Sequence, residues 1–133
     1  VWYEAGDPRC TIKLMHDSIS DDAKIAITVS NATNSTDDSQ SPVMEISKAD
    51  YINSYIQARP MIEHYEATID MVDFRYDAEK NKAVTVEIIS ERGISERAFN
   101  SRTKCITENE LQNDVLISTK AACHTDISFE ESI

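Results

Sequence analysis

After Pro60 the spacing of the apolar residues changes from a period near 3.6 to a period of two, and this change constrains the fold more than any other feature. Residues 64–76 and 82–92 alternate apolar and polar side chains on either side of the segment 77–81. Alternation with period two is typical of strands that bury one face. The two stretches therefore predict a β-hairpin.

A second hairpin is predicted from residues 98–108 and 115–129, which flank the segment 109–114. A register in which paired residue numbers sum to 228 gives four favourable cross-strand pairs: Phe99 with Phe129, Thr103 with Thr125, Arg102 with Asp126, and Ile106 with Ala122. A slip of one residue would bring side chains of opposite faces together. The pattern thus predicts the register as well as the strands.

The same register sets Cys105 opposite Cys123. The pair is either a cross-strand disulfide or two small buried thiols, since directly opposed cysteines strain the bridge geometry. The third cysteine, Cys10, is far away in sequence, and no C-x-x-C motif or suitably spaced histidine completes a zinc-ligand set. We therefore expect no structural metal and no cofactor.

Two short helices precede the hairpins. Residues 7–20 start with Asp7 as a capping residue and Pro8 at the first helical position. Ser47 caps a second helix that runs to Ala58, where Pro60 ends it. The order of helices followed by long hairpins predicts an α+β domain with a strongly antiparallel sheet.

Between the helices, residues 24–30 are rich in β-branched side chains and predict a strand, whereas residues 31–43 predict a polar loop. The loop holds two glycosylation sequons, at Asn31 and Asn34. Polar loops often contain such sequons by chance, and we expect neither to be used.

The composition excludes several functions. Asp and Glu number 24 against 13 Lys and Arg, giving a formal net charge of −11, which disfavours nucleic acids and anionic membranes as partners. The chain has only two glycines, Gly6 and Gly93, so neither a Rossmann nor a Walker loop can be assembled. The apolar runs are too short to cross a bilayer, so no membrane insertion is expected.

Three stretches within residues 45–129 carry a family resemblance: SKADYINSYIQARPMIEHYEATIDMVDFRYD, KAVTVEIISERG and TKCITENELQNDVLISTKAACHTDISF. They resemble the nuclear-transport-factor-two-like superfamily, which includes ketosteroid isomerase, scytalone dehydratase and SnoaL-type cyclases. Residues 17–30 look like the first strand of that family and its lead-in.

The resemblance implies a curved, mainly antiparallel sheet wrapped around N-terminal helices, which is a cystatin-like cone. It also implies that residues 1–133 form a single domain. The long first helix usual in the family is shortened here, lies upstream of Val1, or is replaced. The open end of such a cone holds a small molecule in some members, but the fold hosts unrelated functions.

Candidate catalytic residues follow from the pairing of the first hairpin. A turn centred near Glu79 pairs Asp70 with Ile88, Val72 with Val86, and Phe74 with Val84. If this face is concave, Asp70 is a candidate general base inside the cone, and Tyr51 and Tyr55 are candidate hydroxyl donors from the second helix. The alternative is that both tyrosines only pack and that Asp70 lies at a strand bulge.

The three histidines, His16, His64 and His124, are scattered along the chain. We interpret each as structural or surface-exposed. Strand parity puts His124 outside the cone, on the face of Arg102 and Lys104.

The face opposite Asp70 carries Ile69, Met71 and Ile89, and we predict Ile106 beside them on the neighbouring strand. If the helices cover the other face, these residues form an exposed apolar patch of the kind that marks association. The prediction is a homodimer through the sheet. The alternative is that the faces are reversed and the same residues form the core.

These observations lead to a main hypothesis and an alternative. The main hypothesis is a non-catalytic module that binds a small apolar ligand or a protein partner and is exported from a bacterial cell into the periplasm or secreted. The alternative location is the cytoplasm. The alternative is an isomerase or dehydratase that acts on a small apolar ligand, with Asp70 as base and Tyr51 or Tyr55 as donor.

Overall fold

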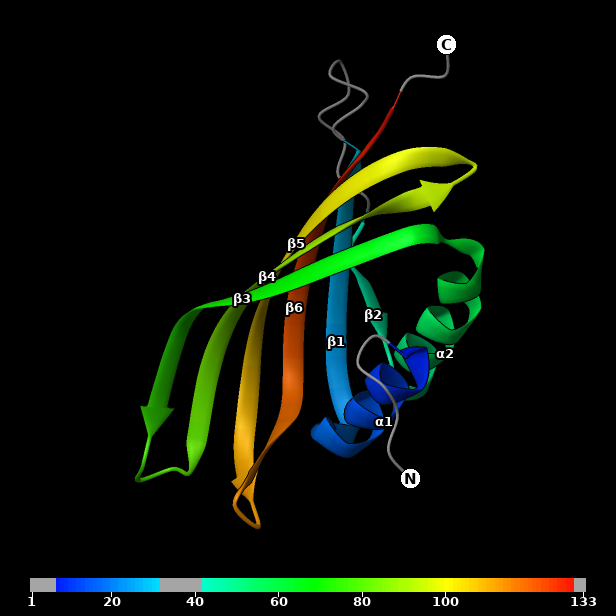
Figure 1. Ribbon diagram of the computed structural model, residues 1–133. Coiled ribbons are helices and arrows are strands. Elements are labelled where there is room, and N and C mark those ends of the chain that lie inside the picture. Colours follow the sequence, from blue (N-terminus) through cyan, green and yellow to red (C-terminus); the bar gives the residue numbers. More distant parts are fainter. Residues whose placement is uncertain (1–6, 32–41, 131–133) are drawn as a thin grey trace.

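The computed structural model describes residues 7–31 and 42–130, and Figure 1 shows a curved sheet with both helices near one side of it. The elements are α1 Pro8–Ser18, β1 Ile19–Asn31, β2 Met44–Ile46, α2 Lys48–Ala58, the 3-10 turn η1 Arg59–Met61, β3 Glu63–Asp77, β4 Lys82–Ser95, β5 Arg97–Gln112 and β6 Val115–Phe129. No helix among these residues is long and apolar enough to cross a membrane.

The described strands form one sheet in the order β2-β1-β6-β5-β4-β3. The strands from β3 to β6 are antiparallel neighbours, as the alternation predicts, whereas β1 lies parallel to β6. The α+β class and the curved, mainly antiparallel sheet are confirmed. The short strand β2 was not predicted, because three residues are too few for a periodic pattern.

The second hairpin has the predicted register. Phe99 pairs with Phe129, Cys105 with Cys123, and the other three pairs are as expected. The connecting turn is shorter than predicted, since only Asn113 and Asp114 lie between the strands. Both adopt left-handed backbone angles, with φ of 49° and 64°, as two-residue hairpin turns require.

The first hairpin departs from its predicted pairing beyond Asp70. Asp70 pairs with Ile88 as expected, but an irregularity between Met71 and Asp73 shifts the rest of the strand by one residue. Phe74 therefore pairs with Thr85 instead of Val84, and Val72 has no assigned partner. The inserted residue is a β-bulge, which a regular alternation cannot anticipate.

Both helices begin at the predicted capping residues. The Asp7 carboxylate accepts from the backbone N–H of Arg9 at 2.9 Å, and Ser47 Oγ accepts from the N–H of Asp50 at 3.1 Å. Lys48, the first residue of α2, is buried and donates to the carbonyl of His16 at 2.8 Å and to Asp21 Oδ1 at 3.0 Å. Lys48 thereby ties α2 to the junction of α1 and β1.

The sheet has two distinct faces. The inner face is the one that meets α1 and α2, and the outer face is the opposite one (Figure 1). The buried apolar residues are Ala23, Ile25, Ile52, Ala83, Phe99 and Cys105. Of the predicted loop, residues 32–41, including the sequon at Asn34, lie outside the described residues, and Asn31 is the last residue of β1.

Candidate functional site: an inner cavity and an outer groove

A cavity of about 240 Å³ lies on the inner face, between the helices and the middle of the sheet. Its apolar wall comes from helix α1 and from strands β1 and β4, together with the paired cysteines of β5 and β6. Its lining residues include Met15, Ile19, Ala23, Ile25, Tyr51, Glu87, Ile89, Cys105, Thr107 and Cys123.

A disulfide joins Cys105 to Cys123 in the wall of this cavity, with their Cα atoms 4.1 Å apart. The predicted adjacency of the two cysteines is confirmed, and of the two alternatives the structure has the bonded one. The bridge links β5 to β6 at their cavity-lining positions. Because Cys105 is buried, the bridge also forms part of the apolar core.

Two of the polar residues that line the cavity are Tyr51, from α2, and Glu87, from the centre of β4. Burial, followed by the nearby charges of Glu91 and Glu87, raises the pKa of the Tyr51 hydroxyl above its ordinary value. The hydroxyl therefore stays protonated at neutral pH and is a hydrogen-bond donor. Glu87 adds an acceptor at the same cavity.

The predicted base, Asp70, lies on the outer face and is exposed. It pairs with Ile88, whereas the neighbouring residues Glu87 and Ile89 line the inner cavity. The prediction that Asp70 projects into the cone is wrong. Strand parity correctly separated Asp70 from Ile69 and Ile89, but parity alone does not tell which face the helices cover.

Tyr55 lies one helical turn after Tyr51 and is half-buried, but it is absent from the cavity lining. Its surroundings include Tyr65, whose hydroxyl donates to Glu91 and whose ring lies 4.4 Å from the Arg59 guanidinium carbon. Burial and the Glu91 carboxylate raise the pKa of Tyr65, with a smaller contribution from Tyr55. Of the two predicted tyrosines, only Tyr51 thus reaches the cavity.

The sheet divides the residues predicted as a dimer face. Ile69, Met71 and Ile89 lie on the inner face, because Ile69 pairs with Ile89 and Ile89 lines the cavity. Ile106 pairs with Val86 and lies on the outer face. The expectation that all four share an outer face is wrong, since the register between β4 and β5 sets Ile89 opposite Thr103.

His124 lies on the outer face, as its parity predicts, within a small polar cluster. Its Nδ1 atom forms a hydrogen bond with Thr28 Oγ1. Its Nε2 atom lies 3.2 Å from Ser30 Oγ and 3.1 Å from Asp126 Oδ1. Hydrogen bonds from Ser30 and His124 lower the pKa of Asp126. The cluster joins the parallel strands β1 and β6, which supports a structural role for His124.

The other two histidines contribute no side chain to the cavity lining. His16 lies near the end of α1 and is exposed, and its carbonyl accepts from Lys48. His64 is also exposed and has a left-handed backbone, with φ of 54°. In the part of the chain that the structure describes, no three His, Cys, Asp or Glu side chains are grouped to hold a metal ion.

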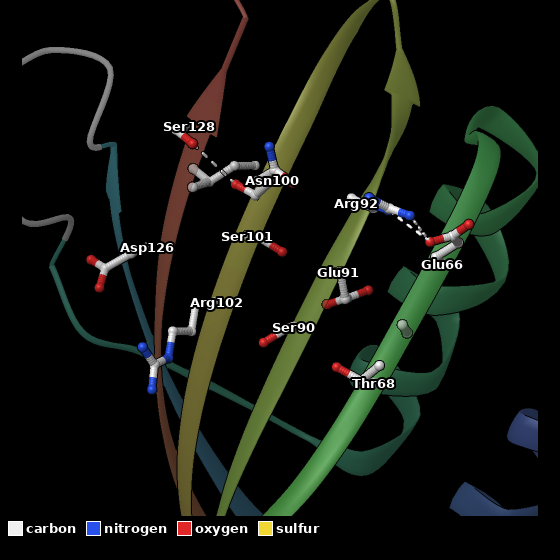
Figure 2. A pocket seen from close by; sticks show the side chains of 12 residues that line it. Glu66, Thr68, Ser90, Glu91, Arg92, Asn100, Ser101, Arg102, Asp126 and Ser128 are labelled. Atoms are coloured by element: carbon white, nitrogen blue, oxygen red, sulfur yellow. Dashed lines mark hydrogen bonds and ion pairs between the residues drawn. The ribbon is translucent and has the colours of Figure 1, made fainter.

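A groove of about 600 Å³ crosses the outer face of β3 to β6, near the end where the strands curve over the helices. Figure 2 shows its side chains, among which Thr68, Ser90 and Arg102 occupy paired positions on successive strands. Arg92 and Glu66 form an ion pair at one wall. The groove offers charges of both signs and several hydroxyls.

No protein-family model and no curated protein sequence matches the chain. Three similar solved structures are those of a conserved protein from Planctomyces limnophilus, an NTF2-like protein from Cytophaga hutchinsonii and a type 2 hexachlorocyclohexane dehydrochlorinase. Their sequence identities to this chain are 8%, 12% and 11%, and their TM-scores are 0.65, 0.57 and 0.60, in that order. The alignments cover 86%, 88% and 94% of this chain and 80%, 84% and 79% of the other chains. The chain therefore has the nuclear-transport-factor-two-like fold, as its sequence pattern predicts.

Proposed function

We propose that the chain is a single non-catalytic domain that binds a small, mostly apolar molecule in the inner cavity. The observation that carries this proposal is the cavity itself, in which polar groups, among them the Tyr51 hydroxyl and the Glu87 carboxylate, interrupt an otherwise apolar wall. A few polar groups in an apolar pocket are typical of ligand sites, because they orient a molecule that burial holds.

The size of the cavity limits the ligand. An apolar protein cavity of about 150 Å³ holds benzene. The cavity of about 240 Å³ is thus large enough for one or two fused rings and too small for a large cofactor. The neutral Tyr51 hydroxyl and the Glu87 carboxylate favour a ligand that both accepts and donates a hydrogen bond, such as a phenol.

A fluorescence titration with 2-naphthol tests this proposal. We expect saturable binding with a dissociation constant on the order of 100 μM for a ligand of this size. Thr107→Phe fills the cavity from β5 and should weaken binding at least tenfold. Glu108→Phe is the matched control, since Glu108 is the next residue on the same strand and points to the outer face. Equal binding by the wild type and both variants would place 2-naphthol elsewhere.

A second candidate function is proton transfer on a ligand in the same cavity, as in an isomerase or dehydratase. Tyr51 and Glu87 together favour it, because a carboxylate base and a neutral donor suffice for such a step. The similarity to the dehydrochlorinase, at 11% identity, shows the fold alone. Once a bound ligand is identified, the test is the rate of deuterium exchange at its acidic carbon. If the cavity is catalytic, the wild type should catalyse this exchange, and Glu87→Gln should lower the rate at least a hundredfold. If the cavity is not catalytic, the wild type should catalyse no exchange.

We also propose that the chain forms a homodimer through the outer face of the sheet. Apolar side chains from β4 gather there around Ile106, which is 47% exposed. They are Val84, Val86 and Ile88. Ile106→Glu should yield a folded monomer in sedimentation experiments, whereas Ile69→Glu, on the inner face, should leave a dimer intact. A monomeric wild type at tens of micromolar in moderate salt would contradict the proposal.

We propose, finally, that the protein is exported to the periplasm or secreted. The disulfide between Cys105 and Cys123 supports this location, because structural disulfides persist in oxidising compartments. Alkylation of the protein inside its native cells, followed by mass measurement, tests it. The two cysteines should resist alkylation unless a reductant is added first.

A further inference from the structure

Strand β3, Glu63–Asp77, lies at the edge of the sheet, with β4 on one side and no described strand on the other. It is 15 residues long, whereas β2 at the opposite edge has only three. A long free edge presents unpaired backbone N–H and C=O groups to any extended chain. Its length makes β3 the stronger template for strand addition.

The side chains of β3 are also unusually apolar for an exposed strand. On the inner side, Ile69 is 65% exposed, Met71 is 56% exposed and Phe74 is 49% exposed. Natural edge strands usually avoid such a surface, since it promotes association. Its presence on a free edge indicates that a partner covers it.

The charges of β3 identify the kind of partner. The strand has five carboxylates, Glu63, Glu66, Asp70, Asp73 and Asp77, against one arginine, Arg75, which leaves a formal charge of −4. Glu66 pairs with Arg92 and Asp73 with Arg75, whereas Asp70 has no ion pair within the described residues. Two copies of β3 side by side would therefore bring like charges together, and a basic strand would bring opposite charges together.

We propose that β3 binds an extended peptide in which apolar residues alternate with lysine or arginine, by adding it to the sheet as a further strand. The apolar residues of the peptide contact Ile69, Met71 and Phe74, and its basic residues face Asp70 and its neighbours. Backbone hydrogen bonds to the free edge hold the peptide, and the alternation of its side chains gives specificity. This site is separate from the inner cavity and does not depend on what that cavity binds.

Fluorescence anisotropy with a labelled peptide tests the proposal. The probe is the capped peptide Ser-Lys-Val-Lys-Val-Lys-Val-Ser, and the comparison peptide has glutamate at every lysine. We expect the basic peptide to bind at least tenfold more tightly than the acidic one, and added salt to reduce the difference. Equal affinity for the two peptides, or no binding of either, would overturn the proposal.

Two pairs of variants test the location. Asp70→Lys should weaken binding of the basic peptide at least fivefold. Glu45→Lys makes the same charge change at the opposite edge of the sheet and should change the affinity less than twofold. A double change of Ile69 and Met71 to threonine should also weaken binding at least fivefold, whereas Val115→Thr on β6 should not. If each control weakens binding as much as its test variant, the contact is not at β3.

Hydrogen exchange measured on the bound wild type tests the mode of binding without any substitution. Peptide addition should slow the exchange of β3 amides and leave the interior strands β5 and β6 unchanged. Unchanged β3 amides in the presence of bound peptide would overturn strand addition. If the β3 amides are already protected without peptide, and the protection falls on dilution, a second copy covers the edge and the proposed partner is wrong.

Discussion

The inner face of the sheet consists of two parts that share one alternating pattern but differ in burial. Near α1 and α2, the inner residues Ile25 and Cys105 are 4% and 8% exposed. On β3, the inner residues Ile69 and Met71 are 65% and 56% exposed. Alternation assigns a side chain to a face, but the elements that cover that face decide whether the side chain is buried.

The cavity lies at the boundary of these two parts. Ile89 and Glu87 line it, and their partners on β3, Ile69 and Met71, are exposed. The sheet extends beyond its helices and thus has three parts. The part under the helices supplies the core, the boundary leaves space for a ligand, and the inner side of β3, which the helices do not cover, is here called the open wing. The following predictions test this division, from the largest expected effect to the smallest.

The largest effect is expected for a truncation under the helices. Ile52 of α2 is 3% exposed, so Ile52→Ala should lower the free energy of unfolding by about 2–5 kcal/mol. Ile69→Ala on the open wing should lower it by less than about 1 kcal/mol. Urea denaturation measures both, and similar losses for the two variants would show that the wing is covered in solution.

The second-largest loss of stability is expected when the disulfide is removed. The bridge closes a sequence separation of 18 residues, and replacing Cys105 and Cys123 together by alanine should lower the free energy of unfolding by about 3 kcal/mol. A thermal melt of the double variant beside the wild type measures this. An unchanged melting temperature would mean that packing alone holds β5 and β6 in register.

A smaller effect is expected at Lys48, which fastens α2 to the end of α1. Lys48→Met keeps much of the aliphatic chain and removes the two hydrogen bonds to His16 and Asp21. The free energy of unfolding should fall by about 1–3 kcal/mol, since these bonds involve a charged donor. Asp50→Asn, an exposed change in the first turn of the same helix, is the control and should cost less.

The smallest effect concerns alkaline pH and Tyr51. The raised pKa of Tyr51 means that the folded protein favours the protonated hydroxyl, so its contribution to stability is complete below pH of about 10, the unfolded value. That contribution falls as the pH rises through the higher pKa of the folded state. Tyr51→Phe should therefore lose less stability than the wild type between neutral pH and pH 11, as measured by urea denaturation. A wild type with the shallower decline would contradict the assignment.

The sequence predicted the register of the second hairpin to the residue because Phe99, Cys105 and Thr103 have matching partners at one register only. It did not predict the bulge after Met71, since an extra residue interrupts the periodicity without changing its composition. It also assigned Asp70 to the cavity instead of Glu87. Both residues belong to alternating strands, and only the tertiary contact of Tyr51 with the Glu87 side of β4 distinguishes the faces.

The most direct test of the binding account is a nitrogen-15 NMR titration of the whole chain with 2-naphthol. The account predicts saturable shifts of the amides around Cys105, Thr107 and Tyr51, and no shifts along the exposed part of β3. Tyr51→Phe should reduce the affinity while leaving the same amides affected. Shifts confined to the outer face or to β3, or no saturable shifts at all, would contradict a ligand site in the inner cavity.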